Sequence, residues 1–212
     1  MTDSRLLRRA ALLGGLATVF FVAEIPLYFI YSGPAPDGVI LVRILLNLLG
    51  VAALIPFLAA LGQLIHRLDA AIDWVTATMI VAGAIWLTLS LVAQSTEGGT
   101  AIVTVARIDP TTDGVLTPGQ FLMQGAMSRV LCAVLLLAAG HALRRTRLLP
   151  GWVGLSAYAV ALLNLAFVPA MFFGHVAAHF YSAQGWGTTA TASGFVIAWF
   201  GALSLALWRA GR

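Results

Sequence analysis

Long apolar runs, separated by short segments that carry turn residues, dominate this chain. Six runs have about twenty residues or more, which is enough for a helix to cross a hydrocarbon core of roughly 30 Å. They cover residues 10–31, 39–64, 74–94, 120–143, 152–180 and 188–208. The sequence does not show the alternating segments of about ten residues that build membrane β-barrels. The pattern therefore predicts an all-α integral membrane bundle of six transmembrane helices.

Turn residues separate these runs. Gly and Pro gather in residues 32–38, 117–119 and 149–151, where we expect the chain to reverse direction. Thr117 and Gln120, with Pro118 between them, form the pattern of a capping box that opens the fourth helix. The only long break, residues 95–118, is expected to be an outer loop whose apolar part, residues 102–108, covers the helix ends or rests in the membrane interface. Residues 1–212 are thus predicted to form a single six-span transmembrane domain.

Three prolines lie inside predicted spans, namely Pro26, Pro56 and Pro169. Each proline removes one backbone hydrogen bond and frees the carbonyl group four residues earlier, which bends a helix. Neighbouring helices or water satisfy such carbonyl groups inside membrane proteins. We expect these bends to serve helix packing or to act as hinges.

The composition agrees with the membrane class. Hydrophobic residues make up 60% of the chain and charged residues 9%, with a mean hydropathy of +0.95, whereas soluble domains carry about a quarter charged residues. The chain has no lysine, which excludes a Schiff base to retinal or pyridoxal phosphate. Its single cysteine, Cys132, excludes a disulfide or a thiolate metal cluster within one chain.

Arginine supplies all twelve basic residues, and its distribution predicts the orientation. The arginines mark the ends of apolar runs and form no basic patch, so we expect no nucleic-acid partner. With the N-terminus inside, the cytoplasmic arginines are Arg5, Arg8, Arg9, Arg67, Arg144, Arg145, Arg147, Arg209 and Arg212. Arg107 is the only one in an outer loop. The positive-inside rule then predicts two cytoplasmic termini in a bacterial-type inner membrane.

Polar residues inside the spans indicate where a ligand would bind. Glu24 in the first span and Arg129 in the fourth each lie roughly 12 Å below the outer end of the helix, at a rise of 1.5 Å per residue. Asn47 in the second span and Asn164 in the fifth fall at about the same depth. Because four helices bring polar groups to one level, we expect a polar cavity that opens to the outer face.

Helical periodicity adds two side chains to this cavity. Tyr28 lies one turn from Glu24, and Arg43 lies one turn from Asn47. Since a charge near the membrane centre costs about 2.5–3.5 kcal/mol, we expect Glu24 to pair with Arg129, and Arg43 to be a second partner nearer the surface. Two arginines and one glutamate leave one excess positive charge, which favours a small anionic or amphiphilic ligand that arrives from outside or from the outer leaflet. The alternative is a purely structural ion pair.

His175 and His179 are the candidate metal ligands. Two histidines four residues apart project from one face of a helix, where they can share a zinc, copper or haem iron. Both fall at the outer end of the fifth span, so a third ligand would come from the outer loop, from Glu97, Asp109 or Asp113. Hydrogen bonds to water or lipid head groups are the other interpretation, and we expect no cofactor.

The fourth and fifth spans carry a family resemblance. The fourth span runs through Leu-Leu-Leu-Ala-Ala-Gly at residues 135–140 to basic residues at 144–147, and Leu-Leu-Pro-Gly-Trp-Val-Gly at 148–154 opens the fifth. This pattern resembles an uncharacterised family of bacterial, mainly actinobacterial, multi-pass membrane proteins built on a domain of unknown function. Its members tend to have Leu-Pro-x-Trp-Leu-Gly after a helix that ends in basic residues. The resemblance implies an integral membrane fold, and no activity, substrate or site.

These observations leave three functions open for a chain surrounded by membrane lipids. The first is a cavity that binds, and transports or senses, a small amphiphilic or anionic ligand. The second is a membrane enzyme acting on a lipid or isoprenoid, with Glu24 as general acid and Arg129 holding a phosphate or developing anion. The third is a small subunit of a larger membrane complex, which would pack on its partners through faces that contain Gly14, Gly15, Gly83, Gly140, Gly194 and Gly201.

Overall fold

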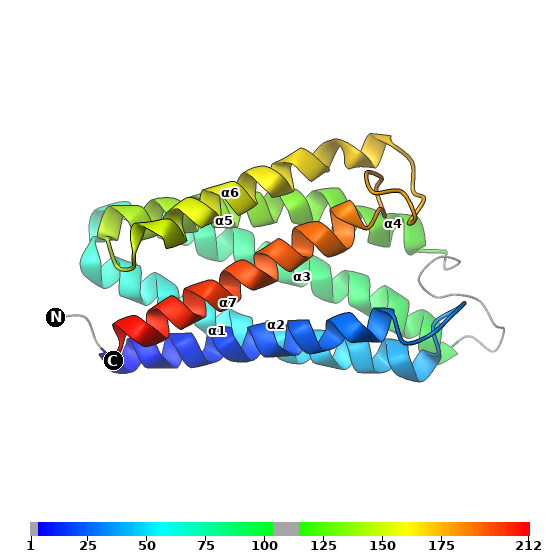
Figure 1. Cartoon of the computed structure of the whole chain (residues 1–212), viewed down its shortest axis with the longest axis horizontal. Helices are drawn as coiled ribbons and strands as arrows, with labels where there is room; N and C mark the ends of the chain where they lie inside the picture. The colour runs from blue at the N-terminus through cyan, green and yellow to red at the C-terminus, as the bar shows by residue number, and fades with distance from the viewer. Residues whose placement is uncertain (1–3, 104–114) are drawn as a thin grey trace.

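Six long helical rods lie side by side in the computed structural model, which describes residues 4–103 and 115–212 (Figure 1). No strand occurs in these two ranges, which confirms the all-α fold class. The rods are α1 (Ser4–Glu24) with the 3₁₀ turn η1 (Ile25–Tyr28); α2 (Asp37–Leu68); α3 (Asp73–Val103), preceded by η2 (Ala70–Ile72); α4 (Thr117–Leu122), the π-helical turn η3 (Met123–Met127) and α5 (Ser128–Thr146); α6 (Gly151–Phe167) with the 3₁₀ turn η4 (Val168–Phe172); and the π-helical turn η5 (Gly187–Thr191) with α7 (Ala192–Ala210).

Each rod is long and apolar enough to cross a membrane, with α4, η3 and α5 counted as one span. This confirms the predicted number of spans and the multi-pass membrane class. Large apolar side chains cover the outside of the bundle, for example Val19 and Leu162, which are 62% and 63% exposed. Such a surface suits contact with lipid chains, because a helix forms its backbone hydrogen bonds within itself.

The helices close into a ring. α1 packs on α2 and α7, α5 packs on α3 and α6, and contacts between α2 and α3 and between α6 and α7 complete the circle. Aromatic side chains fill the centre of the ring, on the side of its middle where α1 begins and α7 ends. Phe57 and Phe200 meet edge to face with ring centroids 5.9 Å apart, and Trp86 stacks on Phe200 at 6.3 Å. We call these three residues the aromatic plug.

The start of α1 and the end of α7 lie at the same end of the bundle, here called the terminal end (Figure 1). The opposite, distal end carries the connections 29–36 and 173–186. All nine arginines assigned to the cytoplasm by the positive-inside rule lie at the terminal end, in or beside the ends of α1, α2, α5 and α7. Of the other arginines, Arg43 and Arg129 are buried in the bundle, and Arg107 lies outside the described residues.

Two of the three prolines end an α-helix instead of bending it. Pro26 lies in the 3₁₀ turn that follows α1, and Pro169 lies in the 3₁₀ turn that follows α6. Each proline lacks the N–H group that the next α-helical hydrogen bond needs, so the winding changes there. Pro56, by contrast, lies inside the continuous helix α2. The fifth span therefore stops at Phe172, and the predicted continuation to residue 180 is wrong.

Helix α3 is longer than the hydropathy pattern predicted. The third span was expected to end at residue 94, whereas the helix continues to Val103. Gln94 and Glu97 lower the hydropathy of this segment, yet they turn towards the centre of the ring and are 6% and 4% exposed. The predicted outer loop at 95–118 is therefore partly helical, and most of its apolar part, residues 102–108, lies outside the described residues.

Small residues allow close contact between neighbouring helices. Of the six glycines considered for packing on a partner, an added Cβ atom would collide with another helix of this same chain at Gly14, Gly83 and Gly140, and would lie only 3.1 Å from Thr18 at Gly201. Gly15 and Gly194, in contrast, face open space. Most of the glycines that were considered for packing on a partner protein thus serve packing inside the ring.

Gly140→Ala is expected to destabilise the fold by about 1–3 kcal/mol, because overpacking a close contact forces the backbone to shift. The new Cβ would lie 2.9 Å from the carbonyl oxygen of Gly154 on α6. The matched control is Gly15→Ala, which meets no atom within 4 Å and should be neutral, or stabilising by up to about 1 kcal/mol through helix propensity. Thermal unfolding in one detergent compares the two variants, and equal transition temperatures would contradict the close contact between α5 and α6.

Cysteine labelling tests the expected orientation in a Cys132→Ala background, since Cys132 is the chain's only cysteine. Ser32→Cys, exposed at the distal end, should react with a membrane-impermeant maleimide on intact cells. Arg212→Cys, exposed at the terminal end, should react only after the membrane is permeabilised. The reverse labelling pattern would show that the termini face outwards.

Candidate functional site

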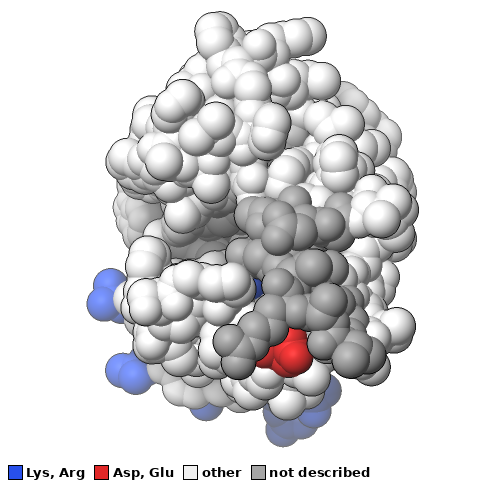
Figure 2. Space-filling view, turned by 90° about the vertical axis from the view of Figure 1, so that its right-hand side faces the viewer, with Lys and Arg blue, Asp and Glu red and all other residues white. Residues whose placement is uncertain are grey.

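A cavity of about 460 Å³ lies in the ring at the distal end. Every ring helix except α6 contributes side chains to its walls, as does the connection that precedes α7. Figure 2 looks onto the distal end and shows the surface hollowed on this face. The volume lies in the range of small-molecule sites in proteins.

The cavity has an apolar floor and polar walls. The floor, which faces the middle of the bundle, consists of Phe21, Val51, Trp86, Leu87, Cys132, Val196 and Ile197. One helical turn closer to the distal end, the same helices present the polar side chains of Glu24, Asn47, Ser90, Arg129 and Ser193. On each helix the floor and wall residues are three or four positions apart, so they share one face. We call the second set the polar layer.

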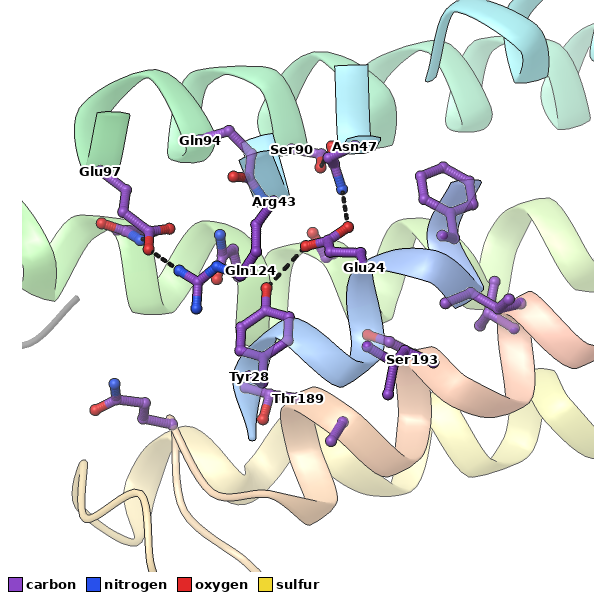
Figure 3. A pocket seen from close by; sticks show the side chains of 18 of the residues that line it. Glu24, Tyr28, Arg43, Asn47, Ser90, Gln94, Glu97, Gln124, Thr189 and Ser193 are labelled. Atoms are coloured by element: carbon purple, nitrogen blue, oxygen red, sulfur yellow. Dashed lines mark hydrogen bonds and ion pairs between the residues drawn. The ribbon is translucent and has the colours of Figure 1, made fainter. Parts of the chain in front are cut away.

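Glu24 is held by two neutral side chains. The Tyr28 hydroxyl donates a hydrogen bond to its Oε1 at 2.9 Å, and Nδ2 of Asn47 donates to its Oε2 at 3.3 Å (Figure 3). The Ser90 hydroxyl donates in turn to Oδ1 of Asn47 at 3.5 Å. The Glu24 side chain is largely shielded from water, with 7% of the residue exposed. These contacts confirm that Glu24 and Asn47 lie at one depth, as helical rise predicted.

Arg43 lies nearer the distal end and has an acidic partner. Its guanidinium forms a buried ion pair with Glu97 of α3 (Figure 3). The guanidinium carbon also lies 4.1 Å from the centroid of the Tyr28 ring, and Nη1 donates to the Tyr31 hydroxyl at 3.3 Å. Nε2 of Gln120 donates to Oε2 of Glu97 at 3.5 Å. The charge of Arg43 is therefore neutralised inside the protein.

Arg129 is surrounded differently. Its Nη1 donates to Oδ1 of Asn164 at 3.2 Å, and its Nη2 donates to the Ser193 hydroxyl at 2.9 Å and to the backbone carbonyl of Gln124 at 3.3 Å. Its Nε has no hydrogen-bond partner among the described residues. The residue is only 4% exposed. Within the described part of the chain, this buried cation thus has only neutral hydrogen-bond partners.

The predicted ion pair between Glu24 and Arg129 is wrong. Each side chain bonds to the neutral groups named above, and they form no ion pair with each other. They line the same cavity from α1 and α5, which occupy opposite positions in the ring order α1, α2, α3, α5, α6, α7. Counting residues from the helix ends gave a common depth, but it could not give the position around the ring.

Glu97, which was predicted to lie in the outer loop, is a cavity residue on α3. It continues a polar stripe on α3, where Ser90, Gln94 and Glu97 follow one another at spacings of four and three. That spacing was the signal that could have identified it. With Glu97 included, the described residues that line the cavity hold two arginines and two glutamates, so the excess of one positive charge predicted from Arg43, Arg129 and Glu24 is wrong for this part of the chain.

Asn164 supports the site from behind instead of lining it. It is fully buried on α6, where its Nδ2 donates to the Val160 carbonyl at 2.8 Å while its Oδ1 accepts from Arg129. The other residues predicted to bind a ligand do line the cavity, namely Glu24, Tyr28, Arg43, Asn47 and Arg129. Asn164 therefore positions the Arg129 guanidinium.

His175 and His179 lie in an exposed segment between η4 and η5 that has no helical structure. The predicted shared helical face is wrong, because the fifth span ends before both residues. No group of three His, Cys, Asp or Glu side chains that could hold a metal ion occurs in residues 4–103 and 115–212. Of the proposed third ligands, Glu97 belongs to the buried ion pair, and Asp109 and Asp113 lie outside the described residues.

Thr117 and Gln120 do not form the predicted capping box. Helix α4 begins at Thr117 without a side-chain hydrogen bond from its cap residue, Leu116. Gln120 points into the cavity, where its Oε1 accepts from the Thr96 hydroxyl at 3.4 Å and its Nε2 donates to Glu97. The glutamine thus serves the site and not the start of the helix.

Comparison with models of known protein families, with curated proteins and with solved structures finds no match to this chain. The resemblance of residues 135–154 to a bacterial membrane family stays a prediction. The function is therefore inferred from the geometry of the cavity.

Breaking the buried ion pair should be costly. Glu97→Gln leaves the Arg43 charge without its acid in the membrane, and removal of one partner from a buried pair costs about 3–5 kcal/mol. Replacing both residues by methionine removes the charge together with its partner and should recover most of that loss. Thermal unfolding in detergent measures both variants.

The matched control is Asp73→Asn, which breaks the exposed pair of Asp73 with His66, whose side chains are 52% and 57% exposed. This acid-to-amide change should cost no more than about 1 kcal/mol. If Glu97→Gln is as stable as Asp73→Asn, the buried pair of Arg43 and Glu97 does not stabilise the bundle as described.

Proposed function

We propose that this protein is a multi-pass inner-membrane protein whose cavity binds a small amphiphilic or anionic ligand from the outer side, and transports or senses it. The observation that carries the proposal is Arg129, a buried cation in the cavity wall whose described hydrogen-bond partners are all neutral. A charged side chain inside a membrane protein normally pairs with an opposite charge or with backbone carbonyl groups, and Arg129 has one such carbonyl, that of Gln124. Here the ligand would supply the opposite charge.

The surroundings of Arg129 suit an anion. A guanidinium binds carboxylates and phosphates through paired hydrogen bonds. The Ser193 hydroxyl, 2.9 Å from Nη2, lines the same wall and offers a further polar contact. Asn164 holds the guanidinium from behind, so the binding group is positioned before the ligand arrives.

The apolar floor favours an amphiphile over a fully polar solute. Phe21, Trp86 and Val196 belong to this floor, one turn below the polar layer. Burying hydrocarbon stabilises a complex by about 0.8 kcal/mol per CH₂ group. A ligand with a short apolar chain would gain this free energy at the floor while its charged group stays at the level of Arg129.

Irregular winding in the cavity walls gives the site parts that can move. The π-helical turn η3 precedes Arg129 on α5, and the π-helical turn η5 precedes Ser193 on α7. Gly125 in η3 departs from helical geometry, with φ −86° and ψ −115°. Such π-helical turns are frequent at functional sites, and interrupted helices build the ligand sites of many transporters. A ligand that contacts both turns would favour one arrangement of α5 and α7.

Glu24 fits a binding role better than that of a general acid. Both of its oxygens accept hydrogen bonds, from Tyr28 and Asn47, and hydrogen bonds of this kind favour the ionised carboxylate over the protonated acid. The second membrane carboxylate, Glu97, is held in the ion pair with Arg43. An enzyme acting on a lipid or isoprenoid would first have to release one of these groups.

Native mass spectrometry of the protein purified in mild detergent tests the proposal. The wild-type protein is expected to retain an adduct with the mass of a small anionic metabolite or amphiphile. Arg129→Gln is expected to lose it, because hydrogen bonds to a charged group contribute about 1.5–3 kcal/mol, or roughly a tenfold or greater change in affinity.

The matched control is Arg9→Gln, which removes an exposed arginine at the terminal end. This variant should keep the adduct. An adduct that survives in Arg129→Gln would contradict the role of this residue. A wild-type protein that carries a partner protein and no small adduct would instead favour the structural-subunit alternative.

A further inference from the structure

We infer that the ligand of this cavity is a zwitterion, a small molecule that joins an ammonium group to an acid group and carries an apolar chain. This inference rests on the proposed ligand-binding function and specifies the chemical class of the ligand. It follows from Glu24, the second charge in the polar layer, for which a simple anion provides no partner.

Among the described residues that line the cavity, four side chains are charged: Arg43 and Glu97 form an ion pair, whereas Glu24 and Arg129 form none. Arg43 and Glu97 neutralise each other. Glu24 and Arg129 bond to neutral groups in the described residues. Since they lie on α1 and α5, at opposite positions in the ring, the cavity has one acidic wall and one basic wall.

A zwitterion is the ligand that suits both walls at once. A purely anionic ligand would contact Arg129 but would bring a second negative charge into the space that Glu24 faces, where repulsion is weakly screened. A simple amine would contact Glu24 but would bring a second positive charge into the space that Arg129 faces. A molecule that carries both charges gives each buried side chain its opposite charge and leaves the net charge of the cavity unchanged.

The acidic wall has the groups that an ammonium needs. An ammonium donates three hydrogen bonds and accepts none. Besides the Glu24 carboxylate, the wall offers the side-chain oxygens of Asn47 and Ser90. In Figure 3 these three side chains lie together, and Ser193 lies across from them on α7. The acceptors and the Arg129–Ser193 donors therefore face one space from different helices.

The floor determines where the apolar chain goes. Below the polar layer, Phe21 and Leu87 line the cavity beside Trp86, which also belongs to the aromatic plug. An apolar chain that points towards the plug leaves both charged groups of the ligand at the level of Glu24 and Arg129. A cavity of about 460 Å³ suits a small molecule of this kind.

Four probes with one eight-carbon skeleton test the inference: 2-aminooctanoate, octanoate, octylamine and N-acetyl-2-aminooctanoate. Their binding to the wild-type protein in lipid nanodiscs is measured by calorimetry, with empty nanodiscs as the blank for partitioning. We expect 2-aminooctanoate to bind roughly tenfold or more tightly than octanoate or octylamine. The N-acetyl derivative, which keeps the acid and loses the ammonium charge, should bind no more tightly than octanoate.

Two variants assign the effect to the two walls. Glu24→Gln keeps the size of the side chain and removes its charge, so it should abolish the preference for 2-aminooctanoate and leave octanoate binding unchanged or tighter. Arg129→Gln should weaken both acids roughly tenfold or more. Arg9→Gln, at the terminal end, should bind all four probes like the wild type.

The outcomes separate this inference from the proposed function. If octanoate and the N-acetyl derivative bind as tightly as 2-aminooctanoate, the ligand is a simple anion, so the zwitterion is overturned while the proposed function stands. If octylamine binds most tightly, both the zwitterion and the anion-binding role of Arg129 are overturned. If the folded wild-type protein binds no probe, the proposed ligand-binding function fails as well. The comparison of probes on the wild type needs no variant, so it holds even if Glu24→Gln does not fold.

Discussion

The burial of charge inside a membrane is the constraint on which the rest of this structure depends. Lipid chains offer no hydrogen bonds, so every charged side chain between the ends of the spans has to be satisfied within the ring. Arg43 and Glu97 meet that demand by joining α2 to α3, and Arg129 meets part of it by joining α5 to α6 through Asn164. The terminal half of the ring carries no such demand, and apolar contacts around the aromatic plug fill it. One ring of helices is thus a packed core at one end and a polar cavity at the other.

The sequence predicted those parts of the fold that depend on length and depth. The thickness of the hydrocarbon core sets the length of a spanning helix, so the apolar runs gave the correct number of spans. The constant rise of a helix gave the shared depth of Glu24 and Asn47, which the structure joins by a hydrogen bond. The partner of Arg129 was not predictable in this way, since it depends on the place of each helix around the ring. A count along one chain does not contain that angle.

Hydropathy also misplaced two helix ends, in opposite directions and for different reasons. It ended α3 too early, because Gln94 and Glu97 are unsuited to lipid although they face the centre of the ring. It ended the fifth span too late, because the segment beyond Pro169 stays apolar after the α-helical hydrogen bonds have stopped. Hydropathy measures how well a segment suits lipid, whereas the end of a helix is set by backbone hydrogen bonds. His175 and His179 were assigned to one helical face for the same reason.

The contact of α7 with α1 has a consequence for biosynthesis. The ring closes between α1 and α7, so the five spans from α1 to α6 can enter the membrane while this seam is still open. In that state the cavity that Glu24 and Arg129 line has no wall from α7. Ser193, a direct partner of Arg129, has not yet arrived. A nascent chain of five spans therefore carries incompletely satisfied charges at membrane depth, where they are costly. The cavity is completed only when α7 has joined the ring, so the insertion of α7 has to precede ligand binding.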